Sequence, residues 1–209
     1  MAYRVLLING SPHEKGCTAR ALSEVARTLE QEGVETEVIH VGKADVRGCI
    51  SCGTCRKTGK CVFQDIVNET APKFEAADGI VAGSPVYYAS PNGTVLSFLD
   101  RLFYSTPFSK HMKVGAAVVS CRRGGNTASF DALNKYFTIS GMPVASGTYW
   151  NQVHGFTAAD VEKDLEGLQT MRNLGRNMAF LIRAIAAEKE KNGLPAVEHG
   201  MFTNFHDGK

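Results

Sequence analysis

The chain has 209 residues and a formal net charge of +2; 44% of its residues are hydrophobic and 21% are charged. This composition supports a sizeable core and excludes a disordered chain, and the length suits one large domain. No lysine or arginine run marks a nucleic-acid surface, and no apolar stretch reaches the roughly 18 residues of a membrane-spanning helix. We therefore expect a globular cytoplasmic protein with neither a nucleic-acid partner nor a membrane span.

The first predicted elements are a strand and a helix joined by a polar loop. Residues 5–8 are consecutively apolar, which is typical of a strand buried on both faces of a parallel sheet. Apolar residues at helical spacing follow over 18–31, and this pattern ends at Gly33. The loop between them brings glycines, hydroxyls and backbone N–H groups to the amino end of the helix, where phosphate binds favourably.

This first loop lacks two common nucleotide-binding motifs. A P-loop needs a lysine after its second glycine, but Cys17 follows Gly16, and the G-x-G-x-x-G of a dinucleotide-binding turn is absent. What remains is a hydroxyl-rich cradle with Ser11 and Thr18 at its ends, which suits a phosphate monoester. The alternative is an ordinary strand-to-helix connection with Thr18 as a helix cap.

Further strands and helices alternate along the chain. The strands are predicted at residues 34–41, 79–83, 113–120 and 143–150. The helices are predicted at residues 65–77, 92–104, 128–139 and 160–191. Five alternations of strand and helix predict an α/β, doubly wound domain with a five-stranded parallel sheet over residues 1–191, followed by a tail at 192–209.

Polar loops follow the first, third and fourth predicted strands. The loop after the third strand covers 84–88, and the loop after the fourth strand covers 121–127 and is rich in glycine. In doubly wound folds, ligands bind outside the carboxyl ends of the strands, where the strand order reverses. We therefore expect the three loops to contribute to one binding site.

Four of the six cysteines form a compact motif: Cys49, Cys52, Cys55 and Cys61. In a chain expected in the cytoplasm, such density favours metal or redox chemistry over disulfides. The spacing suits one cubane cluster better than tetrahedral zinc, whose sites more often use two separated knuckles. It departs from the ferredoxin pattern, however, because five residues precede the fourth cysteine and Val62 replaces the proline. Cys17 and Cys121 lie on other loops and are interpreted as small buried residues.

A combination of motifs in the first 150 residues resembles a known family. The motifs are Gly10-Ser11-Pro12, Gly16 with Thr18, Gly83-Ser84-Pro85-Val86-Tyr87 and Phe98-Leu99-Asp100-Arg101. Together they resemble the flavodoxin-like NAD(P)H-dependent FMN reductases. The cysteine motif, within an insertion at 48–62, is similar to that of the iron-sulfur flavoproteins. The combination is more specific than any of its parts.

The resemblance implies a flavodoxin-like domain that binds FMN without a covalent bond. The residues implied to hold its phosphate are Ser11, His13, Gly16, Cys17 and Thr18. Those implied to lie against the isoalloxazine ring are Pro85, Val86, Tyr87 and Tyr88. The residue types agree with these roles, since phosphate needs amides and hydroxyls whereas a flavin ring needs flat apolar surface.

The loop after the fourth strand would close the pyrimidine side of the flavin with Cys121, Arg122 and Gly124. There Arg122 or Arg123 would favour the anionic reduced flavin. Alternatives remain for both loops. The arginines could be solvated or paired with acidic residues, and Tyr87 and Tyr88 could be half-buried packing residues.

The resemblance also implies an oxidoreductase activity. NADH or NADPH would give hydride to the flavin, which passes electrons to a flavin, a quinone or another small-molecule or protein acceptor. A [4Fe-4S] cluster on the four-cysteine motif would release electrons singly; without one, the motif is a structural loop. The cofactor carries the chemistry, so no catalytic acid or base is expected.

Two other function classes and an assembly state accompany this interpretation. The chain could be a flavodoxin-type electron carrier, reduced only by a protein partner, or a metal-binding regulatory module. We also expect a homodimer or homotetramer, because symmetric homo-oligomers are the common form of assembly.

Overall fold

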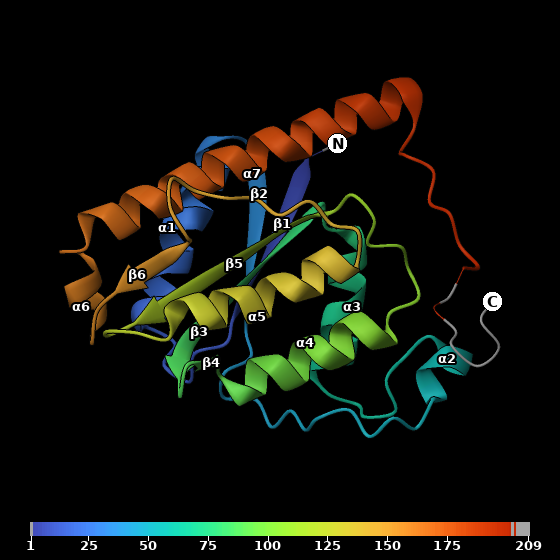
Figure 1. The fold of residues 1–209 in the computed structure, drawn as a ribbon, viewed down its shortest axis with the longest axis horizontal. Helices are drawn as coiled ribbons and strands as arrows, with labels where there is room; N and C mark the ends of the chain where they lie inside the picture. The colour runs from blue at the N-terminus through green and yellow to red at the C-terminus, as the bar shows by residue number, and fades with distance from the viewer. Residues whose placement is uncertain (1, 202, 204–209) are drawn as a thin grey trace.

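The computed structural model describes residues 2–201 and 203. Residue 1 of the expected domain and residues 202 and 204–209 of the expected tail lie outside the described residues. The described chain forms a twisted sheet between two layers of helices (Figure 1). Among these residues, no helix combines the length and the apolar character needed to cross a membrane.

Five parallel strands form the sheet. They are β1 (Tyr3–Asn9), β2 (Val34–His40), β3 (Gly79–Tyr87), β5 (Val114–Cys121) and β6 (Gln152–His154), in the order β2-β1-β3-β5-β6. A short strand, β4 (Ser90–Pro91), pairs antiparallel with the end of β3. The predicted doubly wound, five-stranded parallel arrangement is confirmed, with β4 as an addition. The strand order reverses between β1 and β3, which is where such folds bind ligands.

Helices cover both faces of the sheet. Helices α1 (Cys17–Gln31) and α7 (Leu165–Asn192) lie on one face, and α3 (Ile66–Ala76), α4 (Gly93–Ser105) and α5 (Asn126–Ile139) lie on the other (Figure 1). The side chains of β1 alternate between the two cores: Val5 and Leu7 face α1, whereas Leu6 and Ile8 face α4. All four are fully buried, and each contributes about 1.5–3 kcal/mol of hydrophobic stabilisation.

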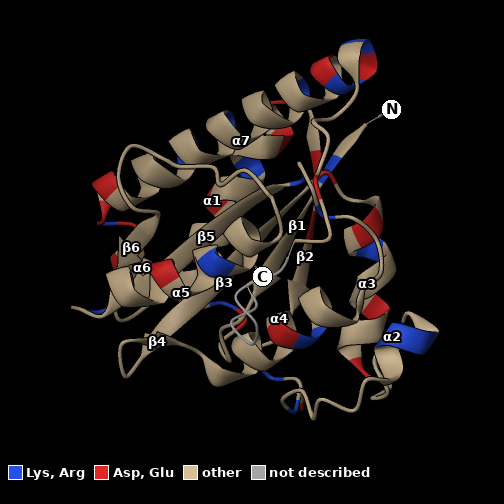
Figure 2. Cartoon of the chain, turned by 45° about the vertical axis from the view of Figure 1, so that its right-hand side comes forward, with Lys and Arg blue, Asp and Glu red and all other residues tan. Residues whose placement is uncertain are grey.

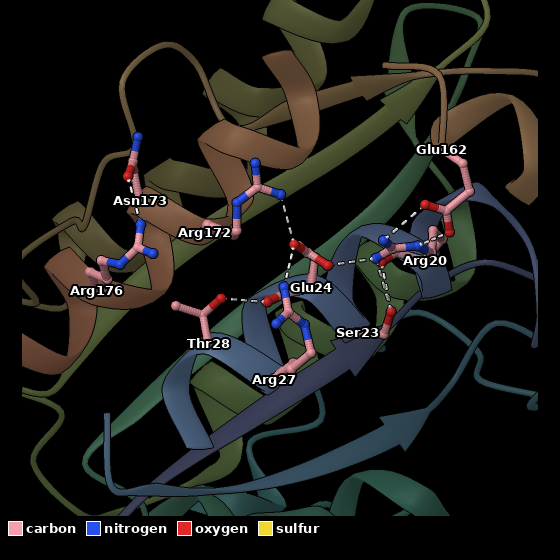
Figure 3. Close-up of polar contacts among 9 residues, drawn as sticks. All are labelled: Arg20, Ser23, Glu24, Arg27, Thr28, Glu162, Arg172, Asn173 and Arg176. Carbon is pink, nitrogen blue, oxygen red and sulfur yellow. Dashed lines mark hydrogen bonds and ion pairs between the residues drawn. The ribbon is translucent and has the colours of Figure 1, made fainter. Parts of the chain in front are cut away.

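A buried carboxylate also joins α1 to α7 (Figure 3). The Glu24 side chain is 5% exposed and accepts hydrogen bonds from three arginines, Arg172 at 2.8 Å, Arg27 at 2.7 Å and Arg20 at 3.0 Å. Burial alone would raise the pKa of Glu24, but the three arginines outweigh it and lower this pKa to about 2. Arg20 also pairs with Glu162, so the network extends to the residue after the short helix α6 (Ala158–Val161).

The fifth strand lies elsewhere than predicted. The sequence predicts it over 143–150, but there only Val144 bridges to β5, and β6 begins at Gln152. The chain leaves the sheet between these points because the fully buried Asn151 stabilises a loop. Its Oδ1 accepts a hydrogen bond from Gly147 N at 2.9 Å. The predicted position of this strand is therefore wrong.

Two predicted segments contain breaks or additions. The helix expected over 160–191 is divided into α6 and α7, because Thr157 and Asp160 form a capping box on α6 and Asp164 caps α7. The cysteine segment holds a short helix, α2 (Thr54–Thr58), that the sequence pattern did not predict. The other predicted helices are present, with bounds that differ by one or two residues.

Candidate functional site

Hydrogen bonds and close contacts join the three predicted loops at the carboxyl edge of the sheet. Gly10 N donates to Gly83 O at 2.8 Å, and Asn92 Nδ2 donates to Gly10 O at 2.7 Å. Gly125, at the start of α5, packs closely on the turn after β3, so that a Cβ there would lie 2.8 Å from Ala89 Cα. The structure thus brings the three loops together beside the reversal of strand order.

The first loop ends at an uncapped helix. Gly16 is the N-cap of α1 and gives it no side-chain hydrogen bond, whereas side chains cap α3, α4, α6 and α7. Ser11 Oγ accepts from His13 N at 3.1 Å and lies inside the loop. The first N–H groups of a helix carry partial positive charge and have no intrahelical acceptor. This loop therefore suits a phosphate group.

The side chains of Cys17 and Thr18 connect α1 to neighbouring strands. Thr18 is 1% exposed, and its Oγ lies 2.8 Å from Ser120 Oγ of β5. Cys17 Sγ donates to Gly155 O at 3.5 Å, and burial raises the pKa of this thiol. The backbone N–H groups of both residues, rather than their side chains, are therefore the groups suited to an anion. Cys121 is buried, as expected for a small packed residue, whereas Cys17 is only half-buried, so that the same expectation is wrong for Cys17.

The second loop is a tight turn with exposed aromatic rings. The predicted extent of this loop, 84–88, is wrong, because strand β3 continues to Tyr87. Tyr88 and Ala89 then turn the chain with positive φ angles of 51° and 58°. Tyr87 is half exposed and Tyr88 is fully exposed. Ser84 is buried, and its Oγ accepts from Asn92 N at 2.9 Å. Asn92 was not predicted as a site residue, although an asparagine at the start of a predicted helix is a recognisable N-cap signal.

The third loop contacts the end of β6. Gly155 N donates to Cys121 O at 3.0 Å, and the Arg122 guanidinium lies 5.8 Å from the centre of the Phe156 ring. A Cβ at Gly124 would meet no atom within 4 Å, so this part of the loop is open. Arg122 therefore contacts an exposed aromatic ring. No sequence pattern pointed to Phe156, because it follows a strand that was predicted in another place.

The four clustered cysteines form a second candidate site. Cys49, Cys52, Cys55 and Cys61 line one shallow hollow that is partly open to solvent. Ile50, Val62, Phe63 and Tyr104 also line it. In the part of the chain that the structure describes, no three His, Cys, Asp or Glu side chains are arranged to hold a single metal ion. The four cysteines instead line one shared hollow.

Hydrogen-bond donors lie against three of these four sulfurs. Ser51 N donates to Cys49 Sγ at 3.4 Å, and Arg101 Nε donates to Cys61 Sγ at 3.2 Å. The hydroxyl and backbone N–H of Thr54 lower the pKa of the Cys52 thiol. Such donors stabilise the thiolate, which is the form that binds metal. The donor set therefore fits a thiolate-ligated cluster.

The charged residues of the cysteine segment itself are basic. Residues 46–64 include Arg47, Arg56, Lys57 and Lys60 and no Asp or Glu. Figure 2 shows basic residues on α2, which is part of this segment. A cluster ligated by four thiolates is an anionic group, so this field favours its binding.

Helix α4 connects the two candidate sites. Its N-cap, Asn92, contacts the first loop, and its residue Arg101 contacts Cys61. A helix rises about 1.5 Å per residue, which places Gly93 and Arg101 about 12 Å apart along the axis. One element therefore positions groups in both places.

Comparisons with known proteins indicate the family of this chain. A family model described as NADPH-dependent FMN reductase matches residues 3–157. An iron-sulfur flavoprotein of Methanocaldococcus jannaschii is 33% identical over 193 residues, covering 87% of this chain and 98% of that protein.

Two solved structures share the fold. The structure of RosB with bound 8-demethyl-8-formylriboflavin-5'-phosphate aligns with a TM-score of 0.71 at 15% identity, covering 100% of this chain and 95% of that chain. A WrbA-like flavodoxin from Agrobacterium tumefaciens aligns with a TM-score of 0.62 at 18% identity, covering 88% of this chain and 99% of that chain. The fold is therefore flavodoxin-like.

Proposed function

The chain belongs to the NADPH-dependent FMN reductase family, and from this premise we propose that it binds FMN and oxidises NADH or NADPH. The observation that carries the proposal is the meeting of three loops at the reversal of strand order, beside the uncapped amino end of α1. When bound, FMN accepts two electrons as hydride and releases them together or singly.

Each loop has a distinct binding role in this proposal. Ser11 Oγ and the N–H groups of the first turn of α1 bind the phosphate, as amides and hydroxyls at a helix start suit an anion. Val86 and Tyr87 give the ring an apolar and aromatic surface next to the β3 turn. Arg122 supplies positive charge on the third loop, which stabilises negative charge on a reduced ring.

We further propose that Cys49, Cys52, Cys55 and Cys61 hold a [4Fe-4S] cluster. The donors against three of the sulfurs and the basic residues of the segment support this, as does the similarity to the iron-sulfur flavoprotein of Methanocaldococcus jannaschii. Such a cluster carries one electron at a time and would pass it to a quinone, a flavin or another acceptor.

Stopped-flow mixing with reduced nicotinamides tests the hydride reaction. The FMN-loaded protein is mixed anaerobically with NADH and, separately, with NADPH, and flavin absorbance is followed. We expect bleaching with at least one of them. A flavin that stays oxidised with both would assign the chain to the electron carriers, and a protein that does not quench FMN fluorescence on titration would contradict flavin binding.

Anaerobic purification tests the cluster independently. We expect about four irons and matching sulfide per chain, with an EPR signal after reduction. Cys52→Ser should lose both. Cys17→Ser, which changes a cysteine outside the motif and keeps its backbone N–H, should retain them. A metal-free anaerobic protein that still oxidises nicotinamide would make the motif a structural loop.

A further inference from the structure

A buried arginine borders the cysteine hollow. Arg101 of α4 is 1% exposed. Its guanidinium donates two parallel hydrogen bonds to Asp65, of 2.6 and 2.9 Å. Asp65 is itself fixed as the N-cap of α3, where it accepts a bond from Val67 N. The orientation of the guanidinium is therefore set by two helices.

The remaining donors of Arg101 are also in use. Its Nη1 donates to Arg47 O at 3.3 Å and its Nη2 to Phe63 O at 3.5 Å, while the guanidinium lies 5.0 Å from the centre of the Phe63 ring. The fifth N–H, on Nε, donates to Cys61 Sγ at 3.2 Å. A guanidinium has five N–H donors, and each has an acceptor here. The Nε–H is the one directed at a cysteine.

Cys61 differs from the other three cysteines in how the chain holds it. The others share the short segment 49–55, whereas Cys61 follows α2 and depends on contacts with two other helices. Asn68 of α3 accepts from Cys61 N at 3.0 Å, and Arg101 of α4 binds the sulfur. The fourth thiol is thus placed by side chains rather than by its own loop.

We propose that Arg101 is a positioning residue that holds the Cys61 thiolate and raises the reduction potential of the cluster. The inference rests on the proposed [4Fe-4S] site. Reduction adds one electron, supplied by the reduced FMN of the proposed reaction, and increases negative charge on the sulfurs. A fixed, buried N–H donor stabilises the reduced form more than the oxidised form. Lysine has no planar fork that binds a carboxylate and a sulfur together.

The test compares variants by EPR-monitored redox titration of the anaerobic protein, with iron content and thermal unfolding measured on the same samples. In Arg101→Lys we expect the cluster to assemble. Its equilibrium constant for one-electron reduction should be about tenfold smaller than in the wild type, which corresponds to a shift of about 59 mV to lower potential. In Arg101→Gln combined with Asp65→Asn we expect the same direction of shift. This double variant leaves no buried charge unpaired, so the reduction potential can be measured in it even if the lysine variant unfolds.

Arg56→Gln is the matched control. Arg56 follows Cys55 and donates to Tyr104 Oη at 2.7 Å, so its replacement removes one positive charge near the cysteines without removing a bond to sulfur. We expect a clearly smaller shift. Unchanged reduction potentials in both Arg101 variants, or a shift in Arg56→Gln equal to theirs, would overturn the inference about Arg101. Neither result would contradict the proposed cluster. An iron-free wild-type protein would instead overturn the cluster, and this inference with it.

Discussion

Ser11 and Thr18 have different roles in the structure although they look equivalent in the sequence. Both hydroxyls flank the first loop, but Thr18 Oγ pairs with Ser120 of β5, whereas Ser11 Oγ bonds to His13 N within the loop. The sequence indicates which residue types a phosphate needs. It does not show which hydroxyl another strand will occupy, because that depends on packing between residues far apart in the chain.

Ser11→Ala is expected to weaken FMN binding. The change removes one hydrogen bond to a charged phosphate, which contributes on the order of 1.5–3 kcal/mol. Fluorescence quenching titration measures it, with Ser23→Ala as the control. Ser23 is exposed on α1 and bonds to the carbonyl of Arg20 in its own helix. An unchanged dissociation constant in Ser11→Ala would place the phosphate elsewhere.

At the scale of elements, the end of β2 and the loop that follows it pack against the backbone of the first loop. His40 Nε2 lies 2.7 Å from Ser11 O, and Gly42 N donates to Asn9 O at 3.2 Å. A Cβ at Gly42 would lie 2.0 Å from Ser11 O and 2.7 Å from Pro12 N. The backbone of the first loop therefore has its present position only because residue 42 has no side chain.

Gly42→Ala is expected to displace the first loop. Overpacking of this kind typically costs about 1–3 kcal/mol, and the shifted Ser11 should also weaken FMN binding. Urea unfolding and FMN titration measure the two effects. Gly93→Ala is the control, because a Cβ there would meet no atom within 4 Å. Equal behaviour of the two variants would contradict the predicted support.

Elements that bury a continuous or periodic apolar face are predictable from the sequence, and β1 and α1 are examples. The misplaced strand at 143–150 and the division of the predicted helix over 160–191 have another cause. They depend on the hydrogen bonds of Asn151 and on the capping residues Thr157 and Asp160. The capping box T-x-x-D was recognisable from the sequence alone. The loop made by Asn151 was not, since its partners are fixed only after the sheet forms. The same limit hid the contact of Arg101 with Cys61.

At the scale of the whole molecule, the Glu24 network makes stability depend on pH. The fold lowers the pKa of Glu24 from 4.5 to about 2, so the contribution of this carboxylate to stability is fully present above the unfolded pKa of 4.5. That contribution is lost as pH falls from 4.5 toward 2. The shift corresponds to on the order of 3 kcal/mol.

Glu24→Gln is therefore expected to lower the free energy of unfolding by on the order of 3 kcal/mol between pH 5 and 7. The difference from wild type should shrink as pH falls below 4.5. Urea unfolding at several pH values measures this. Glu35→Gln is the control, because its ion pair with Arg4 is exposed and surface pairs contribute little. A difference that stays constant down to pH 3 would contradict the assigned pKa.

Helix α4 contributes residues to both candidate sites, so a local opening of this helix would disturb both of them. Proteins open locally in cooperative units, and α4 is one continuous helix of 13 residues. If α4 separates from α3 and α5, Asn92 releases the first loop and Arg101 releases Cys61 in the same event. If the proposed FMN and the proposed cluster are both bound, this opening releases them at one rate, so flavin and iron should be lost together during mild denaturation.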